Sequence, residues 1–201
     1  MKLTALDLDI LKEVGTMGSA HAATALSSLL GKKVKIHVPE TKLIEVSQIP
    51  SIFKNEEEVF TAIYLNIASE IQGGLLLLFR QPEALKLANL LTNKEERILQ
   101  NIGISALKEC GNICINTYLN VLSQLSGLRF VPTIPAYATD MIGALLDGIG
   151  AQLAFEVNEA LLIETEFSIN HQNVSGYFLF IPNPQAISLL LKNIELKRRA
   201  A

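Results

Sequence analysis

The chain has 201 residues, of which 49% are hydrophobic and 18% are charged, with a formal net charge of −3. This composition suffices for a buried core, and it argues against a nucleic-acid partner, because such partners require a concentrated basic face. The one basic cluster, residues 197–199 at the C-terminus, is interpreted as a solvated helix end.

Hydrophobic periodicity predicts similar series of elements in the two halves of the chain. In the first half these are a helix over residues 7–30, strands near 33–38, 43–47, 59–67 and 71–80, and a helix over 82–91. In the second half they are a helix over about 95–125, strands near 129–133, 152–157, 161–169 and 174–181, and a helix from Pro184. An additional helix is predicted at about 139–149 of the second half.

An internal repeat explains this similarity. Residues 11–16 read LKEVGT and residues 107–112 read LKECGN, so four of six residues are identical at an offset of 96. The same offset relates further pairs, including Leu26 and Leu122, Gly31 and Gly127, and Pro39 and Pro135. We therefore predict a single domain over residues 1–201 made of two repeats, about 1–94 and 95–201. Its fold class is α+β with pseudo-two-fold symmetry, with two long helices packed on an antiparallel β-sheet.

The cysteines, the histidines and the lengths of the apolar runs indicate which cofactors the chain could bind and where in the cell it lies. Cys110 and Cys114 would lie one turn apart on the apolar face of a helix, so we interpret them as small buried hydrophobes rather than a redox or disulfide pair. The histidines are scattered, and no metal-ligand spacing occurs. We expect this chain to bind no metal or other cofactor. No apolar run is long enough to span a bilayer and no signal peptide is visible, so we expect a cytoplasmic protein.

The two long predicted helices carry matching polar stripes at about 100° per residue. The second stripe contains Ser105, Glu109, Asn112 and Asn116, and the first contains Asp9, Glu13, Thr16 and Ala20. The opposite sides are expected to face the core: Leu107, Cys110, Cys114, Tyr118, Val121 and Leu125 in the second helix, and Leu11, Val14, Gly18, Ala22, Ala25 and Leu29 in the first. A polar stripe can be an ordinary solvated face. However, asparagine is a poor residue for a helix interior, and the glutamate recurs in both copies, which favours a functional surface for a large partner.

Four residues and their spacing give the second stripe a recognisable motif. Ser105, Glu109, Asn112 and Pro135 are separated by three, two and 22 residues, and Asp9, Glu13, Thr16 and Pro39 repeat this spacing. The pattern resembles the signature of the CheC/CheX/FliY family of chemotaxis phosphatases, and the duplication without an appended domain is most similar to the CheC branch.

This resemblance implies an enzyme that hydrolyses the aspartyl phosphate of a CheY-type response regulator. Asn112 would orient the attacking water, and Glu109 would bind the regulator, while Ser105 and Pro135 would support the helix. Mg²⁺ is expected in the regulator rather than in this chain. Thr16 departs from the motif, so the first site is expected to be degenerate. Some relatives bind the deamidase CheD, for which residues 139–149 are the expected docking segment.

Two other classes of function stay open. The chain could be a non-enzymatic module of the chemotaxis or flagellar switch system that binds the regulator or CheD. It could also be a redox or metal protein that uses Cys110 and Cys114, although their spacing and apolar face argue against it. The sequence does not identify the regulator or the oligomeric state.

Overall fold

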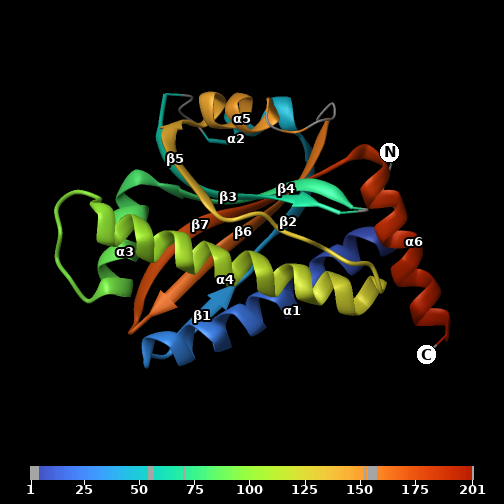
Figure 1. The fold of residues 1–201 in the computed structure, drawn as a ribbon, viewed down its shortest axis with the longest axis horizontal. Helices are drawn as coiled ribbons and strands as arrows, with labels where there is room; N and C mark the ends of the chain where they lie inside the picture. Colours follow the sequence, from blue (N-terminus) through green and yellow to red (C-terminus); the bar gives the residue numbers. More distant parts are fainter. Residues whose placement is uncertain (1–4, 54–56, 70, 152, 154–157, 201) are drawn as a thin grey trace.

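The computed structural model describes residues 5–53, 57–69, 71–151, 153 and 158–200. Its elements in chain order are α1 (Ala5–Leu30), β1 (Val34–His37), β2 (Thr41–Glu45), a 3-10 turn (Val46–Gln48), α2 (Ile49–Ile52), β3 (Val59–Ala68), β4 (Gln72–Arg80), α3 (Gln81–Thr92), α4 (Asn101–Ser126), β5 (Ala136–Met141), α5 (Ile142–Gly150), β6 (Glu159–Ile169), β7 (Gln172–Pro182) and α6 (Pro184–Ala200) (Figure 1).

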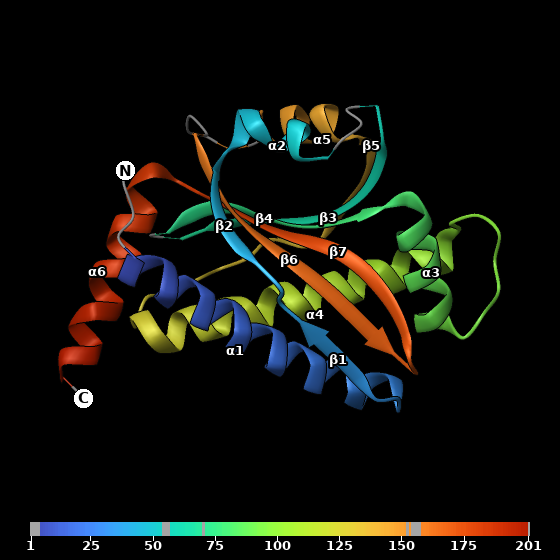
Figure 2. The same cartoon turned by 180° about the vertical axis from the view of Figure 1, so that it is seen from behind.

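A seven-stranded antiparallel sheet forms the middle layer of the molecule. Its strand order is β1-β6-β7-β4-β3-β5, and β2 also pairs with β6. The long helices α1 and α4 run in opposite directions across one face of the sheet, and α2 and α5 cover the other face (Figures 1 and 2). The predicted α+β class, with two long helices on an antiparallel sheet, is confirmed.

The two halves of the chain exchange edge strands. β1 and β2 of the first half pair with β6 of the second, while β5 of the second half pairs with β3 of the first. The two hairpins, β3–β4 and β6–β7, meet in the centre, where β4 pairs with β7. Neither half therefore completes its own sheet, which supports the prediction of a single domain. The division into two repeats stays a prediction that this arrangement supports.

The central strands are buried on both faces, so they read as continuous apolar runs. Leu75 and Leu77 belong to the core beneath α1 and α4, whereas Leu76 and Leu78 belong to the core beneath α2 and α5. This alternation follows from the two-residue period of a strand. One hydrophobic core thus lies on each face of the sheet, between the sheet and the helices that cover it.

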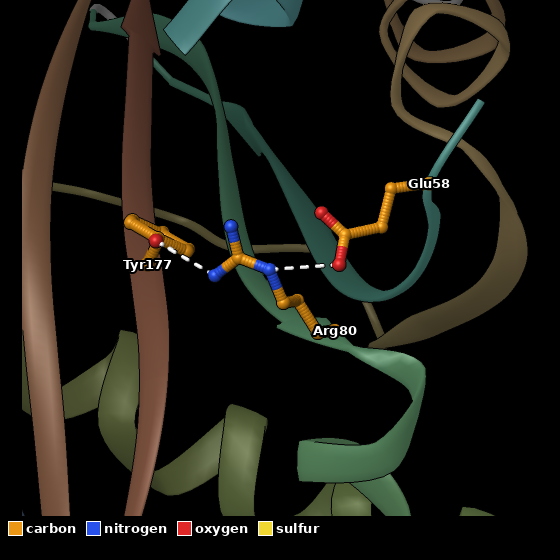
Figure 3. Close-up of polar contacts among 3 residues, drawn as sticks. All are labelled: Glu58, Arg80 and Tyr177. Carbon is orange, nitrogen blue, oxygen red and sulfur yellow. Dashed lines mark hydrogen bonds and ion pairs between the residues drawn. The ribbon is translucent and has the colours of Figure 1, made fainter. Parts of the chain in front are cut away.

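A polar cluster ties the end of β4 to the α2 side of the sheet (Figure 3). Arg80 donates from Nε to Glu58 at 2.9 Å and from a terminal nitrogen to the Tyr177 hydroxyl at 3.0 Å. Its guanidinium also lies 5.9 Å from the ring centre of Phe53 and 5.6 Å from that of Phe60. Burial acts to lower the pKa of Arg80, but the hydrogen bonds to Tyr177 and Glu58 outweigh it and the pKa is raised. These contacts join β4, β7 and the segment before β3, so we interpret the cluster as structural.

Three predicted elements of the second half differ from the structure. The helix predicted from Glu95 begins at Asn101, because the Asn89 side chain exchanges two hydrogen bonds with the backbone of Glu96 and holds it in a loop. The strand predicted at 129–133 is reduced to a single bridge between Ile67 and Pro132, since proline has no N–H for a ladder.

The predicted additional helix at 139–149 is wrong in its first turn. Thr139 pairs with Thr61 in the β5–β3 ladder, and the two hydroxyls are 3.2 Å apart. The helix begins only at Ile142, after the strand pairing ends. The strand predicted at 152–157 lies outside the described residues, apart from residue 153.

Candidate functional site

The polar stripe of α4 lies on the solvent side of the helix layer. Ser105 and Glu109 are exposed, and Asn112 and Asn116 are partly buried. The opposite side contributes Leu107, Cys110, Cys114, Tyr118 and Val121 to the core, as predicted, and Leu125 packs against its edge. The stripe therefore combines an accessible carboxylate with a carboxamide one turn away on a rigid 26-residue helix.

Asn112 has a specific partner within this stripe. The Nδ2 atom of Asn116 donates to the backbone oxygen of Asn112 at 2.8 Å and to its side-chain oxygen at 2.7 Å. The two carboxamides thus form a pair along the helix axis. The sequence placed Asn116 in the stripe but gave it no role.

The first stripe, on α1, is built differently. Asp9, Glu13 and Thr16 are exposed, as is Pro39. The Thr16 hydroxyl donates to the backbone oxygen of Lys12 at 3.0 Å, so it is turned back onto its own helix. A threonine in this rotamer presents a methyl group and no free donor to a partner.

Glu13 is also paired within the chain. The Arg198 guanidinium of α6 forms an ion pair with it, and Lys197 donates to the backbone oxygen of Gln124 in α4 at 3.0 Å. The basic C-terminal cluster is exposed, as predicted, but it also ties α6 to both long helices. The corresponding helix of the first half, α3, has 12 residues against 17 in α6 and carries no basic residue in its last turn.

Close backbone contacts fix the position of α4 over the sheet. A methyl group at Gly111 would lie 2.5 Å from the Ile63 Cγ2 atom, and one at Gly18 of α1 would lie 3.0 Å from the Tyr118 Cδ2 atom. Ile63 pairs with Tyr137 of β5, so Pro135, directly before β5, is brought to the same region as the motif half of α4. The apolar side of α1 follows the prediction at Leu11, Val14, Gly18 and Ala22. Ala25 and Leu29 are exposed instead, and Leu26 is the residue buried near the end of that helix.

Both cysteines are buried free thiols on the core side of α4. A hydrogen bond with Cys110, together with burial, raises the pKa of Cys114 well above its usual value. A thiol that stays protonated is a poor nucleophile and a poor metal ligand. This environment favours the structural interpretation over the redox one.

Other chemistry finds little support in the described part of the chain. Its histidine, cysteine and acidic side chains form no cluster of three that could hold a metal. A surface groove of about 760 Å³, lined by Lys32, Lys86, Lys94 and neighbours, does not include Glu109 or Asn112. None of the described helices is both long and apolar enough to cross a membrane. The candidate site is therefore an open helix face and not a pocket.

Comparison with known proteins identifies the relatives of this chain. A sequence model of the CheC-like family matches residues 6–43, which contain the whole first motif. The CheY-P phosphatase CheC of Bacillus subtilis is 27% identical over 183 residues, which cover 88% of each protein. The chain is thus similar to the CheC-like proteins, and the match to CheC extends over most of its length. The flagellar motor switch phosphatase FliY of B. subtilis is 32% identical over 114 residues, which cover 55% of this chain and 29% of FliY.

A solved structure shares the fold of this chain. The crystal structure of Thermotoga maritima FliY superposes with a TM-score of 0.78 and 20% identity, and the match covers 98% of this chain and all of that one. The resemblance to the CheC/CheX/FliY family inferred from the motif is confirmed by the sequence matches to the CheC-like family model and to CheC. At this identity the superposition establishes the fold, and the site residues rest on the geometry described above.

Proposed function

We propose that this chain hydrolyses the aspartyl phosphate of a CheY-type response regulator, and that Glu109 and Asn112 of α4 carry the activity. The observation that carries the proposal is the outward-facing pair of a carboxylate and a carboxamide on a rigid helix. The relationship to a CheY-P phosphatase supports it. The same relationship supports a cytoplasmic location for the reaction.

The chemistry suits these residue types. Water attacks phosphorus, the bond between phosphorus and the aspartyl oxygen breaks, and the products are the free carboxylate and inorganic phosphate. The aspartyl carboxylate is already a good leaving group, and Mg²⁺ held by the regulator would neutralise the developing charge. What this chain supplies is the orientation of the water, which the Asn112 carboxamide can both donate to and accept from. Glu109 docks the regulator through a basic group near its phosphate.

The first site should contribute little to the reaction. The Thr16 hydroxyl donates to its own helix and Glu13 is paired with Arg198, so the hydroxyl donor and the carboxylate of this site are both engaged within the chain. The activity of the chain is therefore expected to come mainly from the second repeat.

Phosphate release from a purified, phosphorylated receiver domain tests the proposal. Added chain should accelerate release in proportion to its concentration, and Asn112→Ala should remove most of the acceleration while the receiver still binds. Asn120→Ala, which removes an exposed carboxamide from the same helix, is the matched control and should be fully active. Binding without any acceleration by the wild-type chain would replace this proposal with the non-enzymatic binding module.

CheD docking at residues 139–149 is a separate part of the proposal. Ile142, Leu145, Leu146 and Ile149 of α5 are buried against the sheet, so only the other side of this helix is available. It lies on the face of the sheet opposite α4 (Figure 2), which would let CheD and a regulator bind together.

A further inference from the structure

The hydrogen bonds between Asn112 and Asn116 determine which way each carboxamide points. A backbone carbonyl oxygen can only accept, so the atom of Asn116 that lies 2.8 Å from the Asn112 carbonyl is the amide nitrogen. The side-chain atom of Asn112 at 2.7 Å from this nitrogen must accept as well, so it is Oδ1. Oδ1 of Asn112 therefore faces along the helix toward Asn116, and Nδ2 is directed away from it.

This fixed orientation matters for a group that has to hold a water. The terminal torsion of asparagine is broad and roughly two-fold, so a free carboxamide samples both orientations of oxygen and nitrogen. Asn116 selects one of them. Oδ1 keeps a second lone pair to accept a hydrogen bond from the water, and within the described residues Nδ2 of Asn112 makes no hydrogen bond that would compete with a partner.

The first repeat lacks the same partner. At the offset of 96, Asn112 corresponds to Thr16 and Asn116 corresponds to Ala20, an exposed residue without a polar side chain. The first site therefore lacks both carboxamides of the pair, and not only the one that corresponds to Asn112. If the stripe of α4 were only a solvated face, there would be no reason for both asparagines to be replaced together in the first repeat.

We propose that Asn116 is a positioning residue for the phosphatase reaction, acting through Asn112 by holding its carboxamide in the orientation that binds the attacking water. This inference rests on the proposed function. Asn116 is only partly buried and bonds to its own helix, so its removal costs orientation and little else. Because alanine is the better helix former, Asn116→Ala should leave the protein folded.

Steady-state phosphate release from a phosphorylated receiver tests the role. Asn116→Ala should lower kcat about fivefold to tenfold and leave KM within about twofold, because an oriented group acts in the transition state and not in docking. Asn116→Asp keeps the size but replaces the donor by an acceptor that repels Oδ1, so its kcat should be no higher than that of Asn116→Ala. Asn120→Ala should match the wild type.

A spectroscopic measurement separates this role from general support of the helix. In the ¹H–¹⁵N spectrum of the free protein, the Asn116 side-chain amide should show the downfield shift of a hydrogen-bonded proton, and Asn112→Ala should abolish part of that shift. The Asn120 amide should not respond.

The outcomes distinguish the two proposals. A wild-type chain that fails to accelerate phosphate release overturns the proposed function and the role of Asn116 in it. An active wild type with Asn116→Ala at full kcat overturns the positioning role alone. A rise in KM with kcat unchanged in Asn116→Ala also overturns it. So does an Asn116 side-chain amide whose chemical shift matches that of the Asn120 amide.

Discussion

Two glycines that the repeat makes equivalent should respond in opposite ways to the same substitution. Gly15 and Gly111 follow the glutamate of each motif by two residues and lie in the two long helices. Alanine at either position gains helix propensity of about 1 kcal/mol. The surroundings of the added methyl group then decide the sign of the change in the free energy of unfolding.

At Gly15 the new methyl has room. It would lie 3.6 Å from the Ile163 Cδ1 atom, an ordinary contact, beside a cavity of about 30 Å³ that Gly15 helps to line. Burial of one methyl contributes a further ~0.8 kcal/mol. Gly15→Ala should therefore stabilise the protein by roughly 1–2 kcal/mol.

At Gly111 the new methyl would collide with β3. It would lie 2.5 Å from Ile63 Cγ2 and 2.9 Å from Ile63 Cβ, and a β-branched side chain has no rotamer that clears both. The helix must move away by about 1 Å to restore ordinary contact distances. Overpacking of this kind costs typically 1–3 kcal/mol, which outweighs the helix gain. The displacement also moves the adjacent Asn112, so phosphatase activity should fall as well.

Urea unfolding and thermal melting of the two variants check this reasoning. For a chain of this size, 1 kcal/mol shifts the Tm by roughly 2–4 °C, so Gly15→Ala should melt above the wild type and Gly111→Ala below it. A Gly111→Ala protein that is as stable as Gly15→Ala would refute the close seating of α4 on β3.

Three further predictions concern the two motif glutamates, Tyr118 and the two cysteines. Glu109→Ala should raise KM in the phosphate-release assay far more than Glu13→Ala, because Glu13 is already paired within the chain; equal effects would contradict the asymmetry of the two sites. Tyr118→Phe should leave the free energy of unfolding unchanged or raise it by up to ~1 kcal/mol, since its buried hydroxyl has no partner among the described residues; a clear loss in urea unfolding would show that the hydroxyl is bonded. Cys110 and Cys114 should resist alkylation in the native state and react fully after unfolding, because both are buried and the pKa of Cys114 is raised; rapid native labelling followed by mass spectrometry would count against their structural role.

The candidate site could be predicted from the sequence to the extent that it depends on one helix. The spacing of Ser105, Glu109 and Asn112 places them on one face whatever the helix packs against, and the structure leaves that face open. The role of Asn116 could have been found from its spacing of four residues after Asn112, which is the distance of neighbours on a helix surface. Its hydrogen bond, however, depends on side-chain rotamers that the spacing does not specify.

The sequence by itself determined the long helices, the central strands and the family resemblance, because these follow from local periodicity and from residues close together in the chain. Only the tertiary structure decided that the two halves exchange edge strands, since strand pairing is set by long-range contacts that periodicity does not record. The same holds for the ends of the elements. Residues 139–141 form a strand because β3 offers an unpaired edge, and Arg198 reaches Glu13 because α6 packs against α4 beside α1.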